Sequence, residues 1–163
     1  MNREKNLLRR IRLLTQLFII GLFLSGATAL PLDGEVNFLV AQLHADGDSA
    51  AWAQWLVRVN DALSQTRAQY PFLFYGTDWL AFGHFMIALV FVGALRDPVR
   101  NKWLFDFGLM ACVLVIPYAM IFGEVRGIPV WWRLIDCSFG VFGFVPLWFC
   151  RRWVAEMEKG GAD

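Results

Sequence analysis

Four long apolar stretches constrain the fold of this chain more than any other feature of its sequence. They cover residues 13–30, 79–95, 103–123 and 134–150. The first contains no charged residue, and the one ionisable residue of the second is His84. The third and fourth contain one acid each, Asp106 and Asp136. A helix that crosses a membrane needs about 20 mostly apolar residues. The sequence therefore predicts an all-α integral membrane four-helix bundle.

The composition excludes several other classes of protein. Hydrophobic residues make up 58% and charged residues 18% of the 163 residues. A soluble domain has roughly 45–50% hydrophobic and about 25% charged residues. The core of a soluble domain of this length cannot bury the additional hydrophobic residues. The net charge of +1 argues against a generally basic nucleic-acid-binding protein. We expect a single membrane domain over residues 1–163.

The first apolar stretch has two interpretations. Arg9, Arg10 and Arg12 precede it, and the sequence Ala-Thr-Ala at 27–29 ends it, which is the arrangement of a signal peptide with its cleavage site. The run is long for a signal peptide and short for a membrane span. We expect residues 1–29 to remain as an anchor, and cleavage after residue 29 is the alternative.

The distribution of Lys and Arg predicts the topology. Basic residues are concentrated in segments 1–12 and 96–102 and at positions 151–152, whereas segment 31–78 has two Arg against six acids. Segments rich in Lys and Arg stay in the cytoplasm. We therefore expect a multi-pass protein of the inner membrane with both termini cytoplasmic and segment 31–78 outside.

Segment 31–78 has the pattern of an outer helical segment. Apolar residues recur at helical spacing over residues 49–69, residues 35–45 form a weaker helical pattern, and residues 46–48 are typical of a turn. We expect the main amphipathic helix to lie on the outer membrane interface or on the bundle. A cover over a binding site is the alternative.

Polar residues near the predicted outer ends of the spans suggest a binding site. Ionisable residues are costly at membrane depth and often functional. In this interpretation, Arg126 and Arg133 clamp the phosphate or carboxylate of a headgroup, and His84 moves a proton with a nearby acid. The complete predicted outer-face cluster is Asp78, His84, Glu124, Arg126, Arg133 and Asp136.

The alternative for this cluster is structural. Arg133 and Asp136 are three residues apart and share a helix face, so they can form an intrahelical ion pair. Glu124 and Arg126 then only decorate a loop, and His84 donates a hydrogen bond to a carbonyl or a serine.

Basic residues at the opposite ends of the spans form a second group. We interpret them as a topology signal that also contacts anionic lipids, with specific phosphate binding as the alternative. Asp106 is expected to reach Lys102 or Arg100. The predicted inner-face residues are Arg96, Arg100, Lys102, Arg151 and Arg152.

Common cofactor and metal motifs are missing from the sequence. It has no H-x-x-x-H or H-E-x-x-H spacing, no G-x-x-x-x-G-K loop and no G-x-S-x-G elbow. Cys112, Cys137 and Cys150 lie in apolar runs and are expected to be small buried hydrophobic residues. Gly140 and Gly143 favour close packing of the fourth span. We predict no metal and no cofactor.

Two resemblances add to this interpretation. Two stretches near the start of the fourth span resemble the signature of an uncharacterised family of small bacterial polytopic membrane proteins. They are Arg-Gly-Ile-Pro at 126–129 and Trp-Arg-Leu-Ile-Asp-Cys-Ser-Phe-Gly at 132–140. The stretches at 77–84 and 96–101 resemble companion motifs of that family. This resemblance covers about residues 70–153 and implies the topology.

The second resemblance is a distant one, to VanZ-like proteins. The late spans of that family have an acid, then an Arg, then the pattern D-x-x-x-N-x-x-G. This chain has a similar order in Glu124, Arg133, Asp136 and Gly143, although Gly140 stands where that family has Asn. The resemblance implies a role in the cell envelope or with an amphiphile.

The sequence thus favours a small polytopic binding or accessory protein. Its polar site at the outer face would take an amphiphile or a lipid headgroup. A membrane-embedded enzyme acting on a lipid-linked substrate and a structural subunit of a larger membrane complex are the alternatives. The expected partners are membrane lipids, with another membrane protein as a further candidate partner, and no nucleic acid is expected.

Overall fold

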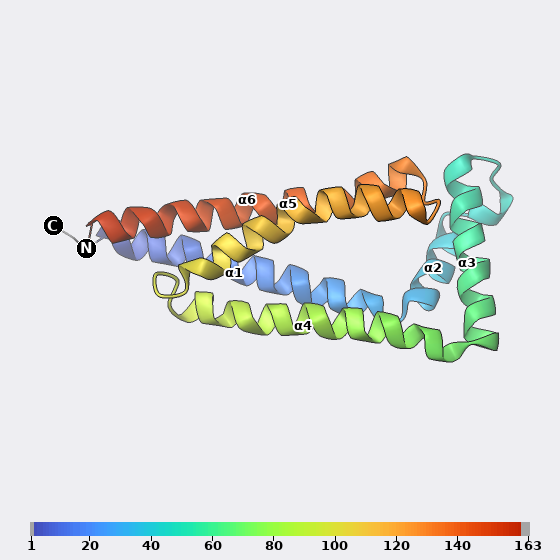
Figure 1. Ribbon diagram of the computed structural model, residues 1–163, viewed down its shortest axis with the longest axis horizontal. Coiled ribbons are helices and arrows are strands. Elements are labelled where there is room, and N and C mark those ends of the chain that lie inside the picture. The colour runs from blue at the N-terminus through green and yellow to red at the C-terminus, as the bar shows by residue number, and fades with distance from the viewer. Residues whose placement is uncertain (1, 161–163) are drawn as a thin grey trace. The chain divides into compact units, whose positions relative to one another are not determined.

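The computed structural model describes residues 2–160, and this part of the chain is helical without strands (Figure 1). The prediction of an all-α fold is therefore confirmed. Two short 3-10 segments, η1 and η2, lie among six α-helices. In chain order, the elements are α1 (Asn2–Ala29), α2 (Leu32–Gln42), η1 (Ala45–Gly47), α3 (Ala51–Gln69), η2 (Pro71–Phe74), α4 (Tyr75–Arg96), α5 (Lys102–Val125) and α6 (Val130–Gly160).

Four of these helices are long and apolar enough to cross a membrane. They are α1, α4 together with η2, α5 and α6. Each covers one of the four predicted spans, except that the first prediction ran to Leu30 and α1 ends at Ala29. Pro117 and Pro146 lie inside α5 and α6 without ending either helix, as expected for prolines whose freed carbonyls can be satisfied by neighbouring groups. The chain is a multi-pass membrane protein.

The described residues divide into two compact units, and the division cuts through α1 and α4. The first unit combines α1 up to Gly21 with the chain from Ala88 onward, and the second unit is Leu22–Ile87. In the first unit, parts of four helices pack around one apolar core, which is a four-helix arrangement. The buried core residues are Ile11, Phe91, Ala94, Leu104, Phe105, Leu147, Cys150 and Val154.

Close packing of α5 on α6 depends on glycines. A Cβ atom built on Gly140 would lie 2.5 Å from the carbonyl oxygen of Cys112, and one on Gly143 would lie 3.0 Å from Cys112 Sγ. A Cβ on Gly108 would lie 2.7 Å from Leu147 Cδ1. Because small residues let helix backbones approach, the expected role of Gly140 and Gly143 is confirmed.

The three cysteines are part of this packing. Cys137 and Cys150 are buried and Cys112 is half-buried, and all three are free thiols. Cys150 belongs to the apolar core of the first unit, as expected of a cysteine that packs as a small hydrophobic residue.

The second unit contains the segment that the sequence predicted to be outside. The predicted helix over 49–69 is α3, the weaker helix is α2, and the turn between them includes η1. Helices α2 and α3 pack on each other, and Val36 and Val40 of α2 and Leu56 of α3 are buried. Arg67 of α3 forms an ion pair with Asp33 of α2, which ties the two helices together.

Candidate functional site

The turn between α5 and α6 has a defined hydrogen-bonded structure. Gly127 has a φ of 67°, the left-handed conformation that favours glycine. Its N–H donates to the carbonyl of Glu124 at 3.0 Å, and the N–H of Ile128 donates to the carbonyl of Gly123 at 2.8 Å. These two bonds form a Schellman motif, which ends α5 and satisfies its last carbonyl groups.

Arg133, in the first turns of α6, closes over this turn. Its Nε donates to the carbonyl of Ile128 at 2.6 Å, and its Nη1 lies 2.5 Å from Oε2 of Glu124. The Arg133 side chain is 9% exposed, whereas that of Glu124 is 75% exposed. A Cβ on Gly123 would lie 2.7 Å from Arg133 Cδ, so the glycine makes room for the arginine. Arg133 therefore holds the end of α5, the turn and the start of α6 together.

The intrahelical ion pair expected between Arg133 and Asp136 is not formed, because the partner of Arg133 is Glu124 on the other helix. Side chains of an α-helix lean toward its N-terminus. Arg133 therefore points back over the end of α5 and away from Asp136, which is three residues further along. Asp136 is half-buried and, within residues 2–160, has no ion-pair partner.

Asp78 and His84 of the predicted outer-face cluster lie on α4 in the second unit. Nδ1 of His84 lies 2.8 Å from the carbonyl oxygen of Leu80 and donates to it. This bond agrees with the structural alternative for His84. The Cβ of His84 also lies against Gly26 of α1, where an added Cβ would be 2.9 Å away. Asp78 is exposed in the first turn of α4.

Of the six residues in the predicted outer-face cluster, only Glu124 and Arg133 form an ion pair with each other in the described chain. Arg126 is the exposed C-cap residue of α5. The geometry thus assigns Arg133 a structural contact. Within residues 2–160, the Glu124–Arg133 pair is the one ion pair that joins members of the predicted cluster, and a single ion pair does not indicate a reaction.

The predicted inner-face residues lie at the other end of the α5–α6 pair. Arg151 Nε lies 2.7 Å from Oδ1 of Asp106, and Lys102 Nζ lies 2.6 Å from Oε1 of Glu158. Asp106 was expected to reach Lys102 or Arg100, and this prediction is wrong. The antiparallel pairing of α5 with α6 instead places a basic residue of α6 beside Asp106.

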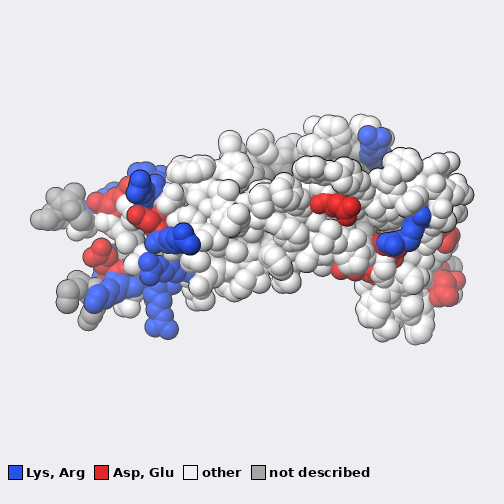
Figure 2. All heavy atoms as spheres, turned by 90° about the horizontal axis from the view of Figure 1, so that it is seen from below, with Lys and Arg blue, Asp and Glu red and all other residues white. Residues whose placement is uncertain are grey.

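Arg152 and Arg96 have other contacts. The guanidinium of Arg152 lies 5.5 Å from the ring centre of Trp148 and 3.9 Å from the carboxylate of Glu156. The backbone carbonyl of Arg96 accepts a hydrogen bond from Arg12 at 3.3 Å. Arg100 is exposed in the loop before α5. In Figure 2, Lys and Arg side chains gather at this end of the first unit, mixed with acids.

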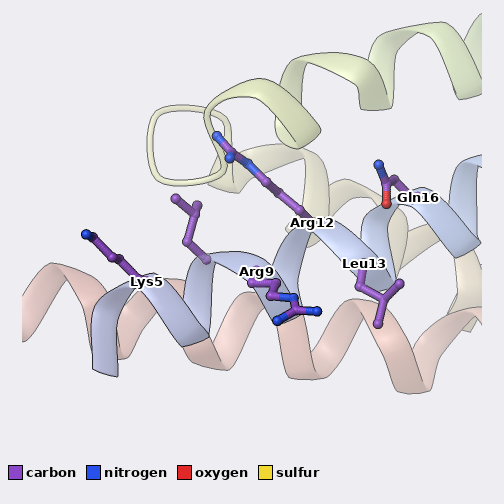
Figure 3. A pocket seen from close by; sticks show the side chains of 6 residues that line it. Lys5, Arg9, Arg12, Leu13 and Gln16 are labelled. Carbon is purple, nitrogen blue, oxygen red and sulfur yellow. The ribbon is translucent and has the colours of Figure 1, made fainter. Parts of the chain in front are cut away.

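A hollow on α1 is a second candidate site, and the sequence did not predict it. Three of its lining residues are cations, none is acidic, and Gln16 adds an amide. Figure 3 shows Arg12 extending toward the loop between α4 and α5, where it donates to the carbonyl of Arg96. The lining residues are Lys5, Leu8, Arg9, Arg12, Leu13 and Gln16.

The cations of this hollow differ from those of α5 and α6. Lys5, Arg9 and Arg12 are exposed and, within the described chain, have no acidic partner. By contrast, Lys102 and Arg151 are both paired with acids. The spacing of four between positions 5 and 9 places these two cations on one helix face, and that signal was available in the sequence.

Comparison with protein-family models, with curated proteins and with solved structures finds no match to the chain. Within residues 2–160, no group of three or more His, Cys, Asp and Glu side chains is arranged to hold a metal ion.

Proposed function

We propose that the chain is a binding or accessory protein of the inner membrane, which holds the phosphate- or carboxylate-bearing headgroup of an amphiphile. One observation carries the proposal: Lys5, Arg9 and Arg12 line a single hollow that has no acidic lining residue. Guanidinium and ammonium groups bind phosphates and carboxylates through charge-assisted hydrogen bonds.

The hollow supports this function better than the predicted outer face does. Arg133, which was the main cation of the outer-face hypothesis, is already bonded to Glu124 and to the carbonyl of Ile128. A headgroup would have to displace both contacts. At the hollow, Lys5 and Arg9 are exposed and have no acidic competitor within the described residues.

The predicted topology agrees with this location. The asymmetry of Lys and Arg predicts that the start of α1 and the end of α6 lie in the cytoplasm. The cytoplasmic leaflet is rich in anionic lipids and attracts basic segments. The headgroup would then come from a lipid of the inner leaflet.

Native mass spectrometry of the full chain purified in mild detergent tests this proposal. We expect a lipid-sized adduct on the wild-type protein and its loss in the double variant Lys5→Gln/Arg9→Gln. This variant keeps Arg3, Arg10 and Arg12 as positive-inside signals. The control is Arg58→Gln, which removes an exposed charge elsewhere and should keep the adduct.

Three results would argue against this proposal. A wild-type protein without any adduct contradicts a binding role. An adduct that persists in the double variant contradicts the hollow as its site. Stoichiometric co-purification of a second protein, with no lipid, favours the structural-subunit alternative.

A further inference from the structure

One face of α1 changes from cationic to apolar along its length. Lys5, Arg9 and Leu13 follow one another at intervals of four residues, and Leu17 and Ile20 continue the same face. The three apolar residues are 56%, 55% and 53% exposed, respectively. The hollow therefore opens onto an apolar stripe on the same helix.

The opposite face of α1 fixes its orientation. Ile11 and Thr15 are completely buried. The Thr15 hydroxyl donates to the carbonyl of Ile11 at 2.8 Å and lies 3.9 Å from Cys150 Sγ on α6. Phe18 continues this face, and its ring centre lies 4.8 Å from that of Phe91 on α4, with the two rings tilted. Because this side is packed into the core, the side with Arg9 and Leu13 must face outward.

The distance along α1 from the cation Arg9 to Ile20 is close to the thickness of one bilayer leaflet. The 11 steps from Arg9 to Ile20 rise about 16 Å along a helix at about 1.5 Å each. The hydrocarbon core of a membrane is about 30 Å thick, so one leaflet contributes about 15 Å. A lipid whose headgroup lies at Arg9 would extend its chains to about Ile20.

We propose that the bound amphiphile is an anionic diacyl phospholipid that lies along α1, an inference that rests on the proposed function. Its headgroup contacts Lys5 and Arg9, and its acyl chains cover Leu13, Leu17 and Ile20. Charge complementarity selects a net-negative headgroup over a zwitterionic one, since the hollow has three cations and no acid. The apolar stripe selects a lipid over a free phosphate compound.

The experiment titrates the purified full chain with dioleoyl phosphatidylglycerol, dioleoyl phosphatidylcholine and glycerol 3-phosphate, with the bound fraction measured by native mass spectrometry. We expect phosphatidylglycerol to bind at least about fivefold more tightly than phosphatidylcholine, the factor expected for about one cation near an anionic surface. Glycerol 3-phosphate should not compete at the same concentration. The variant Lys5→Gln/Arg9→Gln should lose the preference, and Arg58→Gln should keep it.

The outcomes separate this inference from the proposed function. Equal binding of the two lipids overturns the anionic selectivity but leaves headgroup binding standing, because both carry a phosphate. If glycerol 3-phosphate displaces bound phosphatidylglycerol as well as a lipid does, the apolar stripe has no role in binding. Binding of none of the three ligands overturns both proposals.

Discussion

Arg133 and Glu124 form an ion pair across the turn between α5 and α6, with Nη1 and Oε2 2.5 Å apart. The two partners have unequal environments, because the Arg133 side chain is buried and that of Glu124 is largely exposed. Arg133 also bonds the carbonyl of Ile128, which Glu124 cannot do. Loss of the arginine should therefore be more damaging than loss of the acid.

Arg133→Ala is expected to lower the free energy of unfolding by about 2–3 kcal/mol, because it removes a hydrogen bond and an ion pair from the turn. Glu124→Ala should cost about 1 kcal/mol or less, since its carboxylate is exposed to solvent. Denaturant titration in detergent measures both values. The double variant should cost less than the sum of the two single variants.

The control for this prediction is Asp136→Asn, at a residue that has no ion-pair partner in residues 2–160. It should couple weakly with Arg133→Ala. Strong coupling of Asp136 with Arg133, together with additive losses at Glu124 and Arg133, would show that the intrahelical pair forms instead.

Gly140→Ala should destabilise the protein, since its Cβ would lie 2.5 Å from the carbonyl oxygen of Cys112. Overpacking against a backbone atom costs about 1–3 kcal/mol. The matched control is Gly21→Ala, where the added Cβ has no neighbour within 4 Å and stability should stay equal or rise by up to about 1 kcal/mol. Thermal melting in detergent compares the two variants. Equal melting temperatures would contradict the close approach of α5 and α6.

Residues 1–29 are predicted to remain attached to the protein. Ile11 and Thr15 of α1 are completely buried against the rest of the first unit, so removal of this helix would expose an apolar core. N-terminal sequencing of the purified protein should find residues upstream of Leu30. A sequence that starts at Leu30 would show that the stretch is a signal peptide.

Reporter fusions test the predicted topology. After Gly160, a reporter that works only in the cytoplasm should be active. At Asp46, a reporter that works only in the periplasm should be active. The reason is the concentration of Lys and Arg in segments 1–12 and 96–102. Periplasmic activity of the fusion after Gly160 would reverse the orientation and move the hollow to the outer leaflet.

The sequence was sufficient to predict the elements of this fold. Hydropathy located the four spans, and apolar periodicity located α3, because both signals are local. The partner of Arg133 was not predictable in this way. That contact depends on the turn at Gly127 and on the antiparallel return of α6, which bring Glu124 beside it.

The hollow on α1 was missed for a different reason. The basic residues before the first apolar stretch were interpreted as a topology signal and as the start of a possible signal peptide, not as a binding site. Their arrangement as a site depends on which face of α1 is buried, and this is decided by the packing of Ile11 and Thr15 in the core. A count of charges does not contain that information.

Photocrosslinking is the sharpest test of an anionic lipid site on α1. Phosphatidylglycerol with a photoreactive acyl chain is bound to the full chain and irradiated, and the modified residues are mapped by mass spectrometry. We expect the adducts to concentrate on Leu13, Leu17 and Ile20 and to decline in Lys5→Gln/Arg9→Gln. Adducts spread equally over other exposed apolar residues, such as Leu114 and Phe142, would contradict a lipid site on α1.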